Sequence, residues 1–172
     1  MALEIILVCI LGTLFHFTYE LSNHNKYVAL FSAVNESTWE HIKIALSSTF
    51  ILSLFDGFIY GFEANYFYAK ALSLMCVILI IPVIFYTYTF FLKKSILLVD
   101  ILIFYIDIII SQVVFYISLN TIKMLFYINY FSLIVIFIIF SIYLIGTLLP
   151  FKNFLFKDPI TKKYGIKGHT HM

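Results

Sequence analysis

The segment MLFYINYFSLIVIFIIFSIYLIGTLL, residues 124–149, contains no charged residue and is followed by Pro150. A helix needs about 20 mostly apolar residues to cross the hydrocarbon core of a bilayer. This segment exceeds that length. Its apolar and polar residues do not alternate strictly, so it predicts a spanning helix rather than a strand of a membrane barrel.

Four further segments have the same character. One of them, 67–92, is free of charge from Ala71 onward, whereas the others carry a few polar residues. The sequence therefore predicts an all-α fold, a polytopic bundle of five transmembrane helices. The expected spans are 3–21, 37–60, 67–92, 95–118 and 124–149.

The composition supports a membrane protein. Hydrophobic residues make up 63% of the 172 residues and charged residues 12%, against about 45–50% and about 25% in soluble domains. These values exclude a soluble globular domain, a disordered chain and a disulfide-rich secreted domain. The chain has no arginine, which argues against nucleic-acid binding. Cys9 and Cys76 lie in apolar runs, and we expect them to be buried rather than bonded.

The lysines predict the orientation of the chain. With five spans and the N-terminus outside, nine of the eleven lysines fall on the inner side and only Lys70 and Lys123 on the outer side. Basic residues accumulate on the cytoplasmic side of membrane proteins. We therefore expect a multi-pass protein of the plasma membrane. Residues 1–150 would form its transmembrane domain and residues 151–172 a basic, aromatic cytoplasmic tail.

Ionisable residues near the inner ends of the spans are the candidates for function, because such groups cost about 2.5–3.5 kcal/mol each in a bilayer. His16 and Glu20 are four residues apart and share one helix face. The run 35–43, NESTWEHIK, opens the second span. Within it, Ser37 and Glu40 have the spacing of a capping box.

The fourth span carries two further acids. Asp100 lies near its inner end, and Asp107 follows seven residues later on the same face, near the expected midplane. A carboxyl group at that depth is expected to face the interior of the bundle. Asp56, toward the end of the second span, is expected in the outer membrane interface.

Histidine together with carboxylate is the ligand set of zinc, iron or manganese. We therefore expect a divalent metal as the cofactor, bound at the cytoplasmic leaflet. An open position on the metal would activate water for hydrolysis of a lipid-like or isoprenoid substrate. The assigned roles are metal ligand for His16, Glu20 and His41, catalytic base or further ligand for Glu36 and Glu40, and outer-shell or proton-relay group for Asp100 and Asp107.

Other interpretations remain open at this point. The same polar groups could be helix caps and hydrogen-bonded pairs without chemistry, in an accessory subunit of a membrane complex. They could also form a proton relay, with Asp107 as the ion or proton site of a small transport protein. His169 and His171 at the chain end could contact the metal or remain solvated. The sequence does not decide whether the protein is an enzyme.

Three features together resemble a known family. They are the run NESTWEHIK, the pair His16 and Glu20, and the tail FKDP (156–159) with Tyr164-Gly165. The family consists of small multi-pass prokaryotic membrane proteins and is classed only as a domain of unknown function. The resemblance covers nearly the whole chain and implies no activity. It adds weight to His16, Glu20, Glu36, Glu40 and His41 as one site.

Overall fold

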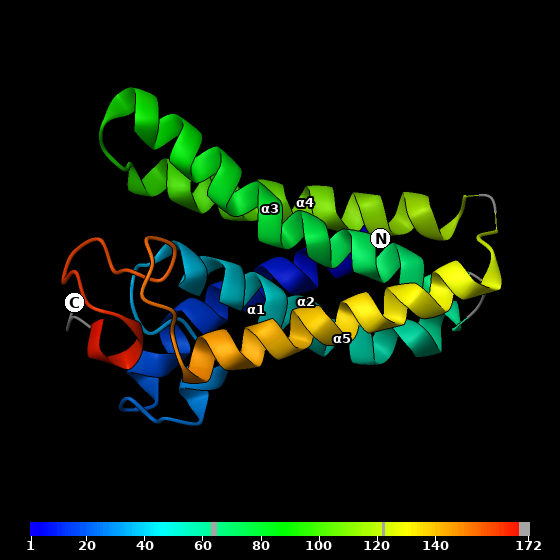
Figure 1. Cartoon of the computed structure of the whole chain (residues 1–172), viewed down its shortest axis with the longest axis horizontal. Coiled ribbons are helices and arrows are strands. Elements are labelled where there is room, and N and C mark those ends of the chain that lie inside the picture. Colours follow the sequence, from blue (N-terminus) through cyan, green and yellow to red (C-terminus); the bar gives the residue numbers. More distant parts are fainter. Residues whose placement is uncertain (63–64, 122, 169–172) are drawn as a thin grey trace.

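A computed structural model describes residues 1–62, 65–121 and 123–168. The chain folds into five long helices, which confirms the all-α prediction (Figure 1). Each helix begins and ends within two residues of the predicted span, and the described residues form no β-strand beyond an isolated bridge between Lys157 and Tyr164. The helices are α1 (Ala2–Leu21), α2 (Thr38–Tyr60), α3 (Tyr66–Leu92), α4 (Leu97–Leu119) and α5 (Phe126–Leu148).

Successive helices run in opposite directions. The α1–α2 turn, the α3–α4 turn and residues 151–168 therefore lie at the same end of the bundle, which we call the tail end (Figure 1). All five helices are long and apolar enough to cross a membrane. The chain is thus a multi-pass membrane protein.

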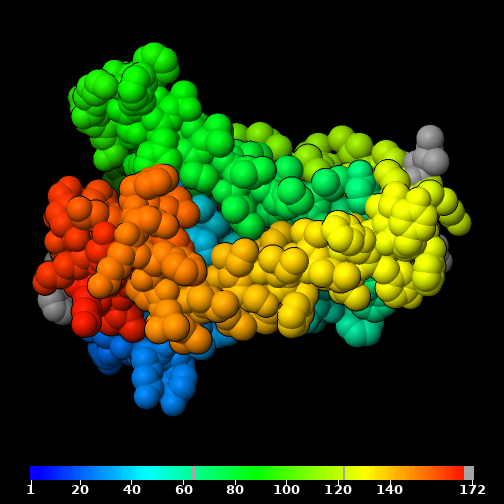
Figure 2. Space-filling model, in the orientation of Figure 1, coloured from blue at the N-terminus to red at the C-terminus, as the bar shows by residue number. Residues whose placement is uncertain are grey.

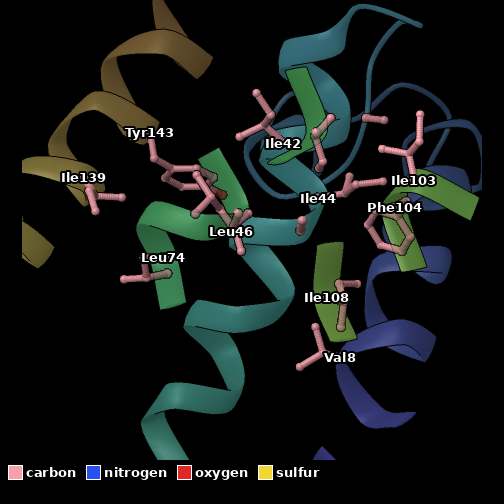
Figure 3. Close-up of a cluster of buried hydrophobic side chains, with 14 residues drawn as sticks. Val8, Ile42, Ile44, Leu46, Leu74, Ile103, Phe104, Ile108, Ile139 and Tyr143 are labelled. Carbon is pink, nitrogen blue, oxygen red and sulfur yellow. The ribbon is translucent and has the colours of Figure 1, made fainter. Parts of the chain in front are cut away.

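Helix α2 forms the centre of the bundle. More than half of its most apolar stretch is buried by the rest of the protein, a larger share than in any other helix, although it is the least apolar of the five. A central helix is shielded from lipid, so it can carry serine and threonine. Its apolar residues meet side chains from all four other helices (Figure 3). This core includes Val8, Ile42, Ile44, Leu46, Leu74, Ile108, Ile139 and Tyr143.

A buried ion pair joins α2 to α3 at the opposite end from the tail. The Lys70 ammonium group donates to the Asp56 carboxylate and lies 3.8 Å from the centre of the Phe115 ring. The expected position of Asp56 at the outer membrane interface stays a prediction. Its side chain is only 6% exposed, because the surrounding protein covers it. An opposite charge on the neighbouring helix makes burial of this carboxylate tolerable.

Residues 151–168 fold back over the tail end of the bundle, where they cover the start of α2 (Figures 1 and 2). The Phe156 ring stacks on Trp39 with ring centres 4.5 Å apart. The Trp39 backbone N–H donates to the Leu155 carbonyl at 2.9 Å. Gly146 on α5 leaves room for the indole, since a Cβ there would lie 2.6 Å from Trp39 Cζ2.

Candidate metal centre

His16, Glu36 and His41 converge at the tail end of the bundle. One ligand atom from each lies within 4.8 Å of the other two. Glu36 Oε2 is 3.9 Å from His16 Nε2 and 3.8 Å from His41 Nε2. The side chains are 21–26% exposed, so the group is shielded but can be reached from outside.

The distances within this triad are too long for hydrogen bonds and suit ligands around an ion. Ligand atoms about 2.0–2.1 Å from a tetrahedral zinc ion lie about 3.3 Å from one another. A contraction of about half an ångström would therefore bring Glu36 Oε2 to this spacing from each histidine nitrogen. The Glu36 side chain can turn to make this movement, since the residue lies outside the helix.

The orientation of His41 favours metal binding. Its Nδ1 lies 3.1 Å from the carbonyl oxygen of Ser37. A carbonyl can only accept, so Nδ1 carries a proton, and in the neutral imidazole Nε2 then keeps its lone pair. Nε2 is the atom that faces Glu36. Metal-binding histidines are commonly held in this way, with the second ring nitrogen donating to a carbonyl or carboxylate.

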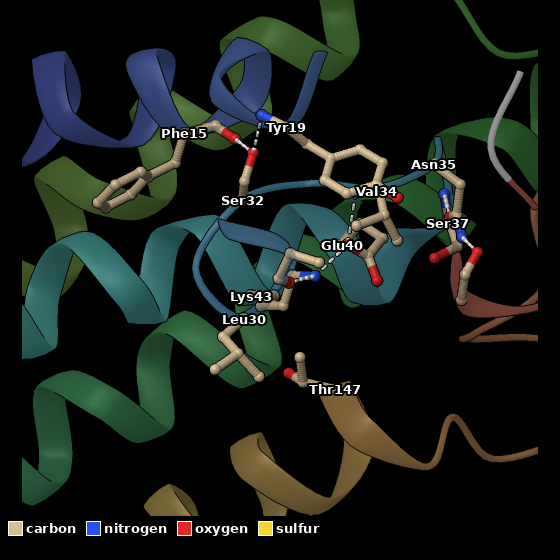
Figure 4. A network of polar contacts seen from close by, with 12 residues as sticks. Phe15, Tyr19, Leu30, Ser32, Val34, Asn35, Ser37, Glu40, Lys43 and Thr147 are labelled. Carbon is tan, nitrogen blue, oxygen red and sulfur yellow. Dashed lines mark hydrogen bonds and ion pairs between the residues drawn. The ribbon is translucent and has the colours of Figure 1, made fainter. Parts of the chain in front are cut away.

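The α1–α2 turn is fixed to α1 beside His16. Ser32 Oγ donates to the Phe15 carbonyl at 2.5 Å and accepts the Tyr19 N–H at 2.8 Å. The Ala33 N–H also donates to the Phe15 carbonyl, at 3.0 Å. These bonds hold the segment that leads to Glu36 against the helix that carries His16 (Figure 4).

Glu40 bonds to groups outside the triad. Its carboxylate accepts the Val34 N–H at 2.9 Å and pairs with the Lys43 ammonium at 2.5 Å. Lys43 in turn donates to the Ala29 carbonyl at 3.0 Å, and both charged side chains are buried (Figure 4). The structure therefore gives Glu40 a place in a network that fixes the α1–α2 turn.

The predicted capping box is absent. Ser37 does precede α2, but its hydroxyl has no hydrogen-bond partner within the described ranges. The Ser37 N–H, which a capping-box glutamate would bind, donates instead to Asn35 Oδ1 at 2.8 Å. Because that donor is taken and Lys43 is buried nearby, the Glu40 carboxylate turns toward Lys43.

Glu20, predicted as a ligand, lies next to a histidine outside the triad. Its Oε2 is 3.1 Å from His24 Nε2. After α1 ends, Asn23 and His24 adopt left-handed backbone conformations with φ of 53° and 61°. This turn brings His24 back to Glu20. The signal that the sequence offered for this geometry is the pair of residue types, since asparagine and histidine are both enriched in left-handed conformations.

The two acids of α4 occupy different surroundings. Asp100 accepts the Tyr88 hydroxyl and lies close enough to His41 and Glu36 for their charges to act on it. Asp107 lies deeper, is fully buried, and has no hydrogen-bond partner for either oxygen in the part of the chain that the structure describes. His169 and His171 lie outside the described residues.

The chain belongs to DUF6512, a family of unknown function whose model matches residues 1–166. No curated protein and no solved structure matches the chain. The predicted membership of an uncharacterised family is thus confirmed. The prokaryotic origin and the motifs that we assigned to the family stay predictions.

Proposed function

We propose that this protein binds one divalent metal ion through His16, Glu36 and His41 and uses it to activate water for hydrolysis. The observation that carries the proposal is the orientation of His41. Its Nδ1–H bond to Ser37 leaves Nε2 as a free ligand atom, facing the carboxylate of Glu36. Two imidazoles and one carboxylate then surround one point, and His41 turns a nitrogen without a proton toward it.

Zinc, iron and manganese suit this donor set. Two histidines and one acid are the protein ligands of hydrolytic zinc sites, and the same set holds iron(II) in oxygenases. In both cases the metal keeps an open position. In the proposed hydrolysis, water at that position would lose a proton and its oxygen would bond to an acyl or phosphoryl centre. The bond to the leaving oxygen would break, and that oxygen would take up a proton.

Asp100 is the group that we propose as the proton acceptor. The Tyr88 hydroxyl that fixes one of its oxygens supports this role, as do the charges of His41 and Glu36 that act on it. The sequence-based hypothesis gave the role of catalytic base to Glu36 or Glu40. Glu36 is now a proposed metal ligand, and Glu40 is less suitable than Asp100. Its carboxylate already holds Val34 and Lys43.

The distribution of lysines supports a site at the cytoplasmic leaflet of the plasma membrane. The triad lies at the tail end, where the bundle meets the membrane surface in this orientation. A substrate there would come from the bilayer or its surface. This position favours a lipid-like substrate with a hydrolysable headgroup.

Metal titration of detergent-purified, chelator-treated protein tests the proposal. Zn²⁺, Mn²⁺ and Fe²⁺ are titrated calorimetrically into the wild type and into the variants His16→Ala, Glu36→Gln and His41→Ala. His24→Ala is the matched control, because this histidine lies on the α1–α2 turn, as Glu36 does, but pairs with Glu20. We expect one bound ion in the wild type and the control, and affinity lower by at least tenfold in the three variants. Equal affinity in all five proteins would refute the proposal.

A transport function is the second candidate, supported by the full burial of Asp107 and the absence of a described partner for its oxygens. A carboxyl group at this depth is a common ion or proton site. Proton flux into liposomes that contain the wild type, lost in Asp107→Asn, would support this function. Liposomes without flux above the protein-free background would exclude a proton pathway.

A further inference from the structure

Asp158 in the tail makes a direct contact with the backbone of Glu36. Its Oδ1 accepts the Glu36 N–H at 3.1 Å. Its Oδ2 accepts the Ile160 N–H at 3.1 Å, the Thr161 hydroxyl at 2.7 Å and the Thr161 N–H. The carboxylate is completely buried. One side of it therefore closes a turn of the tail, while the other side holds the candidate ligand.

Glu36 depends on this contact more than the two histidines depend on theirs. His16 and His41 lie within helices α1 and α2, whose backbone bonds fix their directions. Glu36 precedes α2, and the bond to Asp158 is the one its N–H makes. Ligands on loops are less exactly placed than ligands on helices unless surrounding groups support them.

The tail also holds the residues on both sides of Glu36. Asn35 Nδ2 donates to the Gly165 carbonyl at 2.9 Å. On the other side, the Trp39 N–H donates to the Leu155 carbonyl. Gly168 fits closely against this segment, since a Cβ there would lie 3.0 Å from Asn35 Nδ2 and 3.3 Å from Asp158 Cβ. The segment that carries Glu36 is thus shaped by residues more than a hundred positions later in the chain.

We propose that Asp158 is a positioning residue of the metal centre, which holds Glu36 so that its carboxylate meets His16 and His41. This inference rests on the proposed metal site. It makes the tail a part of that site, because the carboxylate that fixes the ligand comes from the tail. Loss of groups that orient a metal ligand typically lowers metal affinity by about 10- to 100-fold.

The test compares Co²⁺ binding and amide exchange in four proteins. They are the wild type, Asp158→Ala, Asp158→Asn and the control Thr161→Val. The control removes the hydroxyl contacts with Asp158 Oδ2 and the Gly168 carbonyl and leaves the Oδ1 bond to Glu36. Asparagine has one carbonyl oxygen, so it can accept either the Glu36 N–H or the bonds from Ile160 and Thr161, but not both sets. We expect affinity to fall by about 10- to 100-fold in Asp158→Ala and less in Asp158→Asn, with a changed visible absorption of bound Co²⁺. Thr161→Val should stay within twofold of the wild type.

Hydrogen exchange at the Glu36 amide gives a readout that needs no metal. We expect faster exchange in Asp158→Ala than in the wild type and Thr161→Val, with similar exchange across α2 as evidence of an intact fold. If the wild type binds Co²⁺ and Asp158→Ala binds it within twofold, the inference is overturned and the metal site stands. If the wild type binds no metal, the proposed function fails, and the inference fails with it. The exchange data would then still show whether Asp158 holds Glu36.

Discussion

Similar side chains in the run from Asn35 to Lys43 take different parts in the structure. Glu36 and Glu40 are both acids near the start of a helix, and the sequence suggested one catalytic role for both. Glu36 faces His16 and His41, whereas Glu40 is buried against Lys43. The difference arises from the positions of Ala29 and Val34, which bind Lys43 and Glu40. The spacing of three residues allows Glu40 to pair with Lys43, but local spacing carries no information on the contacts with Ala29 and Val34.

The Glu40–Lys43 pair leads to a prediction on stability. Glu40→Gln leaves the buried Lys43 ammonium without its opposite charge, and loss of one partner of a buried pair costs about 3–5 kcal/mol. The double variant Glu40→Gln/Lys43→Met removes the unpaired charge and should recover most of this loss. Thermal unfolding in detergent measures both effects. If Glu40→Gln alone is as stable as the wild type, the claim that Glu40 and Lys43 form a buried ion pair is contradicted.

For Asp107 we predict the opposite effect on stability, because its removal should not destabilise the protein. Its oxygens find no partner in the described segments, and an unsatisfied buried polar group costs about 1–3 kcal/mol. Asp107→Leu removes that cost, so we expect unfolding stability equal to or above that of the wild type. A loss of more than about 3 kcal/mol in the same unfolding assay would show that the carboxyl group makes a stabilising interaction.

At the scale of the helices, the sequence predicts boundaries well and contacts poorly. A spanning helix ends where its apolar run ends, so its bounds can be read from the composition of each segment. Which faces meet depends on the packing of all five helices. Two such contacts, the pairing of Asp56 with Lys70 and the packing of Trp39 against Gly146, therefore could not be predicted from the sequence.

The contact between α5 and Trp39 can be tested with one methyl group. Gly146→Ala places a Cβ within 2.6 Å of Trp39 Cζ2 and 3.1 Å of Phe156 Cε1. Overpacking of this kind typically costs about 1–3 kcal/mol. Trp39 is the only tryptophan in the chain, so its fluorescence reports this site alone. We expect a shifted emission and lower stability, with neither change in Ser141→Ala, a half-buried site on the same helix.

At the scale of the whole molecule, the number of spans and the all-α class follow from composition, but the docking of the tail does not. By sequence, residues 151–168 belong to a basic, aromatic cytoplasmic tail, whose lysines and aromatic residues interleave without a helical or strand period. In the structure, Phe156 and Asp158 are buried against the start of α2. The triad itself could be predicted by residue type, since His16, Glu36 and His41 were all proposed. The choice among the nearby acids required the fold.

The orientation of the molecule gives a topology prediction. In a background where Cys9 and Cys76 are serine, cysteines replace Lys123 and Lys163, which are both exposed and lie at opposite ends of the bundle. We expect a membrane-impermeant maleimide to label position 123 in intact cells and position 163 only after lysis. The reverse pattern would place the tail and the triad on the outer side.

X-ray absorption at the zinc edge of the loaded protein measures the proposed centre most directly. We predict a shell of nitrogen and oxygen ligands at about 2.0–2.1 Å, with the outer scattering of two imidazoles. That scattering should fall to one imidazole in His41→Ala. A wild-type spectrum without imidazole scattering, or one that His41→Ala leaves unchanged, would contradict a metal centre built from His16, Glu36 and His41.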